Sequence, residues 1–269
     1  MLERGSMSAN ETIRSRANPL LKRAGAALAG QEVGTIALEG DRLVDDALAA
    51  GVEFDTILVA DDREDRAVAL ERSGKNVRRV EANLLARVSD LSTSPGILAL
   101  AVAPLPIDLG RFPVDERTLF LVVAGVADPG NLGALARSAE AFGARALLVA
   151  RGGANPWSAK ALRGSMGSLL RLPVSHGVAV NEIARALTAR GVRQVFASTR
   201  DGKQLASFDW RGPIALWMGS ETGALPESAR GFERVTIPMA GRVESLNVAV
   251  AASLLLHASG RVAGNGRDG

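Results

Sequence analysis

The chain has 269 residues, enough for one or two domains with a substantial core. Its hydrophobic fraction of 47% and charged fraction of 23% are typical of soluble globular proteins, and a net charge of +3 does not by itself identify a partner. The absence of cysteine excludes disulfides and thiolate metal sites, and His176 and His257 lack the spacing of zinc ligands.

The N-terminus is charged and polar where a signal peptide needs an apolar run. The most apolar stretch, residues 237–258, is too short and too interrupted to span a bilayer. We therefore expect a cytoplasmic protein with neither a membrane segment nor a metal site.

The first half of the chain alternates between strands and helices. Residues 1–12 are predicted to be a flexible leader, residues 13–103 a small α/β domain, and the proline-rich residues 104–116 a linker. The predicted helices are Ile13–Leu28, interrupted near its start by Asn18-Pro19, Asp41–Ala50, Asp62–Ser73 and Ala82–Val88. The predicted strands are Thr35–Leu38, Thr56–Val59, Val77–Val80 and Gly96–Val102.

The second half, residues 117–259, repeats this rhythm with more apolar strands, which indicates a parallel sheet covered on both faces. Residues 260–269 are predicted to be a flexible tail. The predicted strands are Thr118–Val123, Ala146–Ala150, Gln194–Ala197, Ile214–Met218 and Val235–Ile237, and the predicted helices are Leu132–Phe142, part of Ala159–Leu170, Val180–Arg190 and Leu246–Ala258.

Ligands of open parallel sheets bind beyond the carboxyl ends of the strands, and unusual residues follow three strands of this chain. The first cluster is Asp128-Pro-Gly-Asn131-Leu-Gly133, in which Asn131 is predicted to cap the helix that follows. Arg137 lies about 140° round that helix from Leu132 and points away from the apolar stripe. On these residues alone, a capped helix with a solvent-facing arginine is favoured over a binding site.

The second cluster, Gly219–Leu225, contains Glu221, which is either a turn carboxylate or an acceptor for a ligand or for Arg137. In the third, Pro238 ends a strand and Ser245 is predicted to cap a helix that is apolar nearly all round, and therefore buried. Its polar entry, Glu244–Asn247, is either a satisfied cap or a binding site.

Between the first and second clusters lies Lys160–Gly167. This segment is either an anion-binding helix end with Arg163 and Ser165 or an ordinary amphipathic helix interrupted by glycine. The glycine signatures of Rossmann dehydrogenases, P-loop enzymes and Ser hydrolases are absent from the sequence.

The motifs that carry a family resemblance are Asp128–Gly133 with Arg137 and Gly143, Met218–Glu221 with Gly223 and Leu225, Ile237–Met239 with Glu244–Val248, and Arg163–Gly167 followed by Arg171–Pro173. Together they resemble the SpoU (TrmH) family of RNA ribose 2′-O-methyltransferases. The first half resembles the RNA-binding domain that such enzymes often carry, through Ser15–Pro19 with Lys22, Leu38–Gly40 with Arg42, and Ser94–Ala99. Here Ser-Pro-Gly stands where that domain often has Pro-Gln-Gly.

The resemblance implies a SPOUT methyltransferase domain with a C-terminal trefoil knot that binds S-adenosyl-L-methionine, and a homodimer. Carried over, the cofactor-binding residues are Thr199, Gly219, Ile237 and Leu246. The catalytic residues are Arg137, Asn131, Glu221, Ser245 and Asn247. The RNA-binding residues are Arg16, Lys22, Arg23, Arg42, Arg163 and Ser165.

The implied activity is 2′-O-methylation of a ribose in RNA, with 23S ribosomal RNA as the expected substrate. The same reaction on transfer RNA is an alternative, although the family's transfer-RNA enzymes often lack the separate N-terminal domain. A non-catalytic RNA-binding or ribosome-assembly protein of this fold is the rival from another class. The presence of Asn131, Arg137 and Asn247 favours the enzyme.

Overall fold

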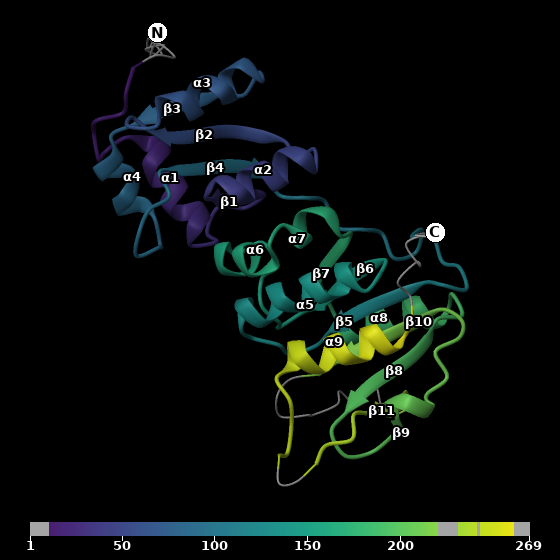
Figure 1. Ribbon diagram of the computed structural model, residues 1–269. Helices are drawn as coiled ribbons and strands as arrows, with labels where there is room; N and C mark the ends of the chain where they lie inside the picture. The colour runs from purple at the N-terminus through teal and green to yellow at the C-terminus, as the bar shows by residue number, and fades with distance from the viewer. Residues whose placement is uncertain (1–10, 220–230, 241–242, 261–269) are drawn as a thin grey trace, which may run out of the picture. The chain divides into compact units, whose positions relative to one another are not determined.

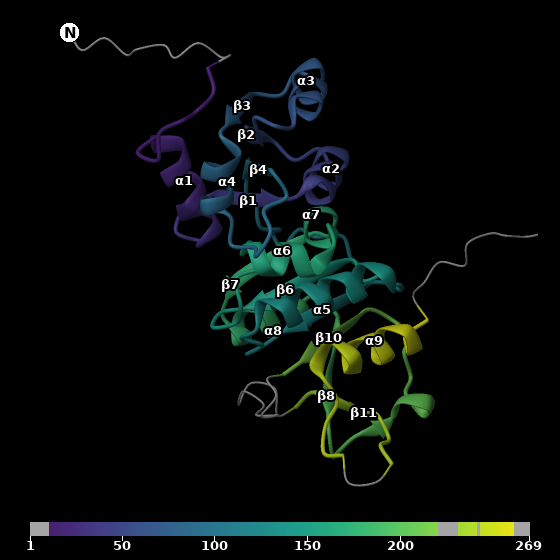
Figure 2. The same ribbon diagram turned by 60° about the vertical axis from the view of Figure 1, so that its left-hand side comes forward.

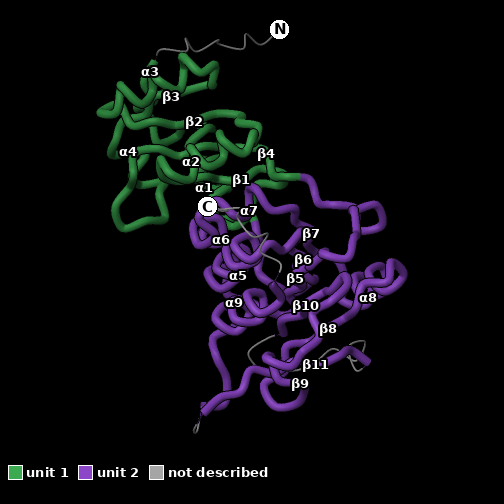
Figure 3. The backbone as a smooth tube through the Cα atoms, turned by 45° about the vertical axis from the view of Figure 1, so that its right-hand side comes forward, with its two compact units in different colours: residues 1–104, 157–159 green, residues 105–156, 160–269 purple. Residues whose placement is uncertain are grey.

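The computed structural model describes residues 11–219, 231–240 and 243–260. The chain divides into two compact units, residues 1–104 with 157–159 and residues 105–156 with 160–269 (Figure 3). Among the described residues, no helix is long and apolar enough to cross a membrane.

The first unit is a four-stranded sheet with helices on both faces, and its strands and helices alternate along the chain as the sequence predicts (Figure 1). The strand order is β1-β4-β2-β3, in which β4 is antiparallel to β1 and β2, and β2 is parallel to β3. The strands are β1 (Thr35–Glu39), β2 (Phe54–Ala60), β3 (Val77–Val80) and β4 (Ile97–Val102), and the helices are α1 (Pro19–Leu28), α2 (Asp41–Ala49), α3 (Glu64–Arg72) and α4 (Ala82–Val88).

The predicted helix Ile13–Leu28 is too long, because α1 begins only at Pro19. The side chain of Asn18 accepts a hydrogen bond from the Leu20 amide at 2.9 Å and caps the helix, while Pro19 occupies the first turn, where no N–H is needed. Ile13 instead adds a single bridge beside β3, donating its amide to the Arg79 carbonyl at 2.9 Å.

Helices α1 and α4 cover one face of this sheet, and α2 and α3 lie on the other (Figure 2). The core under α1 and α4 combines Leu21 and Ala24 of α1 and Leu85 of α4 with Leu58 and Leu98 of the central strands. The side chains in this layer are buried apolar groups, so removal of their surface from water is the main stabilising contribution.

The second unit contains a sheet in which all seven described strands are paired in parallel, in the order β7-β6-β5-β10-β8-β11-β9. The prediction of a parallel sheet is confirmed, although it missed the two edge strands, β7 and β9. The strands are β5 (Leu119–Val123), β6 (Ala146–Ala150), β7 (Val174–Val178), β8 (Arg193–Ser198), β9 (Lys203–Gln204), β10 (Ile214–Met218) and β11 (Glu233–Thr236).

The helices of this unit are α5 (Pro129–Ala141), α6 (Ala159–Ser165), α7 (Ser168–Arg171), α8 (Val180–Thr188) and α9 (Val248–Ala258), with a 3₁₀ turn at Leu205–Ser207. Helix α8 covers one face of the sheet, and α5 and α9 lie together on the other (Figures 1 and 2).

The segment predicted as a linker belongs to the core of the second unit. Ile107 donates its amide to the Val174 carbonyl on β7 at 3.1 Å. Arg190 donates to the Leu109 carbonyl at 2.8 Å, and Leu109 and Phe112 pack with α8 on Phe120 of β5. A proline-rich segment without periodicity is therefore ordered here by packing rather than by regular structure.

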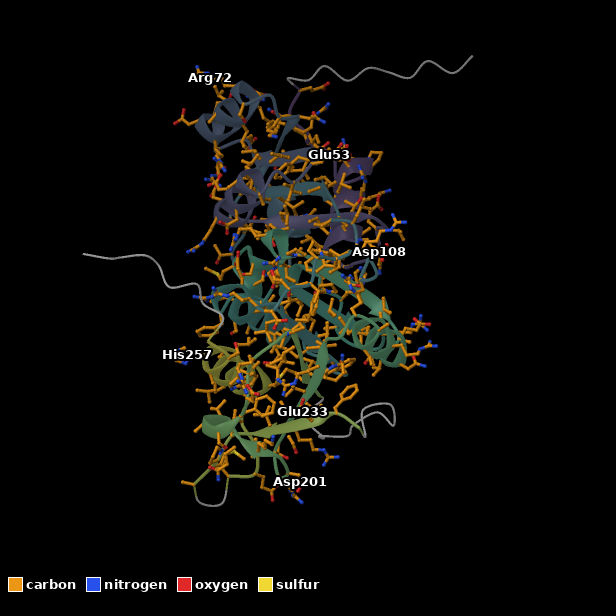
Figure 4. The ribbon with its side chains drawn as sticks, turned by 90° about the vertical axis from the view of Figure 1, so that its right-hand side faces the viewer. Glu53, Arg72, Asp108, Asp201, Glu233 and His257 are labelled. Carbon is orange, nitrogen blue, oxygen red and sulfur yellow. The ribbon has the colours of Figure 1, made fainter. Side chains whose placement is uncertain are left out.

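Helix α9 returns from the C-terminal end of the chain to pack on α5. The hydroxyls of Ser138 on α5 and Ser253 on α9 lie 2.7 Å apart and are hydrogen-bonded. The prediction that this helix is buried all round is wrong, because Val250 is 50% exposed and Leu254 is 42% exposed. One apolar stripe of α9 therefore faces outward, and His257 lies on the side away from the sheet (Figure 4).

Candidate functional site

Helix α5 begins just beyond the carboxyl end of β5, and its N-terminus is held by Asp128. The predicted cap, Asn131, is wrong: the carboxylate of Asp128 accepts from the Asn131 amide at 2.8 Å, and Pro129 fills the first turn. The other oxygen of Asp128 accepts from the ammonium of Lys160 on α6. Lys160 first, and the Asn131 amide second, hold the pKa of Asp128 below its ordinary value, so this cap is charged at neutral pH.

Because the carboxylate of Asp128 accepts the hydrogen bond from the backbone amide at the start of α5, the side chain of Asn131 is available for another contact. Asn247 donates from Nδ2 to Oδ1 of Asn131 at 3.1 Å, across 116 residues of sequence. Oδ1 of Asn247 accepts from the Ala249 amide at 2.9 Å and caps α9, so the prediction of Ser245 as the cap is also wrong. The two asparagines join the N-termini of α5 and α9, the ends at which helix dipoles are positive.

Replacement of Asn247 can separate its two roles. In Asn247→Asp the cap oxygen remains and the donor to Asn131 is lost, whereas Asn247→Ala loses both. We expect Asn247→Ala to lower the free energy of unfolding by about 1 kcal/mol and Asn247→Asp to leave it nearly unchanged, because Asn and Asp cap equally well. Urea unfolding measures this. Equal destabilisation of the two variants would contradict the assignment of the cap.

Arg137 is exposed on α5 and makes no hydrogen bond or ion pair with any residue in the described ranges. Its neighbour Ser138 contacts α9, and successive helical residues are about 100° apart, so Arg137 lies on a different side of α5 from the α9 contact. This agrees with the expectation that it points away from the apolar stripe. Asn131 is six residues earlier, about 9 Å along the axis of α5. Because helical side chains lean toward the N-terminus, the Arg137 side chain extends along the helix toward the end that carries Asn131.

The N-terminal half of α5 packs against α6 through glycine. A Cβ atom on Gly133 would lie 2.5 Å from the Ala161 carbonyl oxygen and 2.8 Å from the backbone of Gly164 and Ser165. Only a glycine permits this approach, and the distance between α5 and α6 therefore depends on Gly133. The same segment then turns sharply, with Met166 at φ 50° ahead of Gly167.

This packing corrects the prediction for Ser165. Its side chain is fully buried, donates to the Leu162 carbonyl at 2.8 Å and accepts from the Leu169 amide at 3.4 Å. A hydroxyl in this position closes a helix end and is not accessible to RNA. Arg163, two residues earlier, is half-buried and has interactions within the protein.

A cavity of about 540 Å³ opens beyond the carboxyl ends of β8, β10 and β11, against α9. All four residues predicted to bind the cofactor line it, together with Ser245 and Glu244. The lining residues are Phe196, Ala197, Ser198, Thr199, Arg200, Asp201, Met218, Gly219, Arg234, Val235, Ile237, Met239, Glu244, Ser245, Leu246, Val248, Ala251 and Leu255. Leu246 and Val248 flank Asn247, so the cavity adjoins the asparagine pair.

Glu221, predicted as catalytic, and Gly223 lie outside the described residues. In the parts of the chain that are described, no group of three or more Asp, Glu or His residues is arranged to hold a metal ion.

In the first unit, three of the four residues predicted to bind RNA are exposed: Arg16, Lys22 and Arg42. Arg23 is engaged within the protein, since its Nε donates to Glu32 at 2.8 Å and its Nη1 donates to Asp55. We therefore assign Arg23 to the structure of this unit, where it ties α1 to the residues that precede β1 and to β2.

Sequence reasoning missed Asp128, Lys160 and Arg200 as residues of the site. The Asp-Pro pair was an available signal for the cap, because Pro is common at the first helical position. No pattern in the sequence pairs Lys160 with Asp128, which lies 32 residues away.

A parallel sheet with a cavity at the carboxyl ends of its strands, beside paired polar side chains from two helix ends, defines an α/β protein with a ligand site of enzymatic type. The SpoU rRNA Methylase family matches residues 118–257, and the MRM3-like substrate binding domain matches residues 30–99. The chain belongs to the SpoU rRNA methylase family, which confirms the resemblance and makes it an RNA ribose methyltransferase by class.

Three known proteins show how far the similarity extends. The 23S rRNA (uridine(2479)-2′-O)-methyltransferase of Streptomyces viridochromogenes is 33% identical over 69% of this chain and 67% of its own. The 23S rRNA (guanosine-2′-O-)-methyltransferase RlmB of Ralstonia nicotianae is 32% identical over 76% of this chain and 86% of its own. The AdoMet-bound rRNA methyltransferase of Sinorhizobium meliloti superimposes with a TM-score of 0.83 at 27% identity, covering 93% and 97% of the two chains.

Proposed function

We propose that this protein transfers a methyl group from S-adenosylmethionine to a ribose 2′-hydroxyl of 23S ribosomal RNA. The observation that carries the proposal is the union of two features: a cavity formed by Thr199, Gly219, Ile237 and Leu246, and the Asn131–Asn247 pair beside it. The relatives named as 23S rRNA 2′-O-methyltransferases and the AdoMet-bound structural neighbour support it.

The cavity fits such a cofactor in size and character. Its volume lies in the range of small-molecule sites, about 300–1,000 Å³, and its walls are polar and apolar in about equal measure, with Phe196, Met218 and Leu255 among the apolar side chains. At Gly219 an added Cβ would lie 3.1 Å from the Phe196 ring, so a glycine keeps the backbone close to the cavity. Bound there, S-adenosylmethionine supplies an electrophilic methyl group and needs no metal.

The residues of the α5 end act on the hydroxyl that attacks. A ribose 2′-hydroxyl is a poor nucleophile and loses its proton during the attack. Arg137 cannot take this proton, because a guanidinium stays charged in proteins. We assign Arg137 to holding an RNA phosphate and stabilising the developing charge on the 2′-oxygen, while a phosphate oxygen or water accepts the proton. Asn131, Ser245 and Asn247, with Glu221, position the ribose and Arg137.

The C-terminal segment is proposed to form the trefoil knot of SPOUT methyltransferases. The support is the path of the chain: β10 lies between β5 and β8, and α9 returns to pack on α5, more than a hundred residues earlier. Such a path brings the ends of β10 and β11 and the entry to α9 into one cavity.

The first unit is proposed to hold the RNA through phosphate contacts. Arg16, Lys22 and Arg42 are exposed there, with no described ion pair, whereas the neighbouring Arg23 and Arg79 are neutralised by carboxylates. The match to a substrate-binding domain supports this role of the first unit, and the relatives named as 23S rRNA methyltransferases support ribosomal RNA as the substrate.

We also propose that the protein is a homodimer in the cytoplasm, with a second copy covering the outward stripe of α9. Val250 and Leu254 are one helical turn apart, and Val243, just before the helix, is 58% exposed.

We expect Leu254→Glu to shift the protein from dimer to monomer at micromolar concentration, as measured by light scattering. Val33→Glu, at a 98% exposed apolar residue of the first unit, is the matched control and should leave the mass unchanged. A monomeric wild-type protein would contradict the proposal.

The substrate is tested by incubating the protein with methyl-labelled S-adenosylmethionine and separated ribosomal and transfer RNA that lack its modification. We expect label in large-subunit ribosomal RNA. Label confined to transfer RNA would identify transfer RNA as the substrate instead. No label in either naked RNA or assembled particles would favour a non-catalytic RNA-binding protein.

A further inference from the structure

The cavity has a charged end as well as apolar walls. Ser198, the last residue of β8, and residues 199–201 after it line this end together with Arg234 of β11. Two of the lining residues are arginines, Arg200 and Arg234, and they differ in their surroundings. Figure 4 shows Asp201 on the loop after β8, at the same end of the unit as β9 and β11.

Arg234 is already neutralised. Its guanidinium, on β11, donates at 3.3 Å to the carboxylate of Asp201, which lies on the loop between β8 and β9. Arg200 is exposed, and it forms no ion pair with a residue in the described parts of the chain. At the charged end of the cavity, Arg200 is therefore the cation whose charge no described carboxylate offsets.

The backbone that carries Arg200 is held in place. The Ser198 hydroxyl accepts from the amides of Arg200 at 3.5 Å and Asp201 at 3.2 Å, closing the turn after β8. Gly202, at φ 142°, packs so closely on β11 that an added Cβ would lie 2.7 Å from the Arg234 carbonyl oxygen. The turn is thus fixed to β11, and Arg200 is presented at the rim of the cavity from a rigid support.

We propose that Arg200 recognises the carboxylate of the aminoacyl end of the cofactor. This inference rests on the proposed function. The carboxylate is the single anionic group of S-adenosylmethionine, and a guanidinium binds a carboxylate through two parallel hydrogen bonds. An arginine fixed in this way orients the cofactor: the adenosine part lies against the apolar side chains of the cavity, and the aminoacyl end lies at Arg200.

The test compares two ligands that the enzyme cannot consume: S-adenosylhomocysteine and its decarboxylated analogue, which lacks only the carboxylate. Binding is measured by titration calorimetry with the full chain. We expect wild-type protein to bind S-adenosylhomocysteine about tenfold or more tightly than the analogue, and Arg200→Met to lose most of this preference by weakening S-adenosylhomocysteine alone. Arg200→Lys should keep part of it, because a point charge replaces the fork. Lys203→Met, an exposed cation three residues on and outside the cavity, should behave like wild type.

The outcomes separate this inference from the proposed function. If wild-type protein binds neither ligand, the proposed cofactor site itself is wrong. If it prefers S-adenosylhomocysteine and Arg200→Met keeps the full preference, Arg200 does not hold the carboxylate. If Arg200→Met weakens both ligands equally, the residue acts on the cavity's structure. A variant that binds both ligands normally and loses affinity for RNA would assign Arg200 to the substrate instead.

Discussion

Replacement of Arg137 by alanine is expected to reduce the rate constant for methyl transfer by a factor on the order of 10²–10³, the usual effect of losing one charge-stabilising donor in a transition state. Arg137 is exposed, lies outside the α5–α9 contact and does not line the cavity. The affinity for S-adenosylhomocysteine and the free energy of unfolding should therefore remain close to wild type. Single-turnover methylation, calorimetry and urea unfolding measure the three quantities.

Arg185→Ala is the matched control, because Arg185 is also an exposed helical arginine but belongs to α8, on the other face of the sheet. Its methylation rate should be unchanged. Arg137→Lys should recover only part of the rate, since lysine keeps the charge and loses the planar fork. Normal turnover by Arg137→Ala would remove this residue from the mechanism.

Replacement of Gly133 by alanine is expected to destabilise the second unit by about 1–3 kcal/mol, the usual effect of overpacking. The added methyl would meet the backbone of Ala161, Gly164 and Ser165 at 2.5–2.8 Å, so α5 and α6 have to separate. Because Asn131 is two residues earlier on α5, the same shift should weaken its contact with Asn247 and lower the methylation rate.

Gly25→Ala is the control for this substitution. Gly25 is also inside a helix, α1, yet an added Cβ there would meet nothing within 4 Å. The change should stabilise the first unit by about 0.5–1 kcal/mol, because alanine is the better helix former. Thermal or urea unfolding should thus move in opposite directions for the two variants. Equal stability of Gly133→Ala and wild type would show that the α5–α6 approach is looser than described.

Much of the fold follows from local patterns, and the errors have identifiable causes. Runs of Leu, Val and Ile predicted all the central strands of the second unit, whereas the edge strand β7 contains Ser, His and Gly and lacks that pattern. Both functional helix caps were misplaced for the same reason: several polar residues stand before each helix, and only tertiary contacts decide which of them caps. Asp128 is fixed by Lys160, and Asn247 by its contact with Asn131.

The site was predictable only as separate motifs. Glycine and polar residues after three strands indicated where a ligand binds, and residues from the strand ends and the entry to α9 do line one cavity. Composition gave no reason to separate Arg200 from Arg234, or exposed Arg16 from ion-paired Arg23. Those distinctions depend on carboxylates such as Asp201, Glu32 and Asp55, which the fold brings near. The exposed stripe of α9 could not be predicted either, because a helix that is apolar on every side gives no indication of which face packs against a neighbour.

The central claim, transfer of a methyl group to a ribose 2′-oxygen, is tested most directly by digesting labelled large-subunit RNA to nucleosides and analysing them by mass spectrometry. We expect the label on the ribose of one nucleoside, and we expect the adjoining phosphodiester bond to resist alkaline hydrolysis, because the 2′-oxygen is blocked. A methyl group on a base, or a labelled site that alkali still cleaves, would contradict the account.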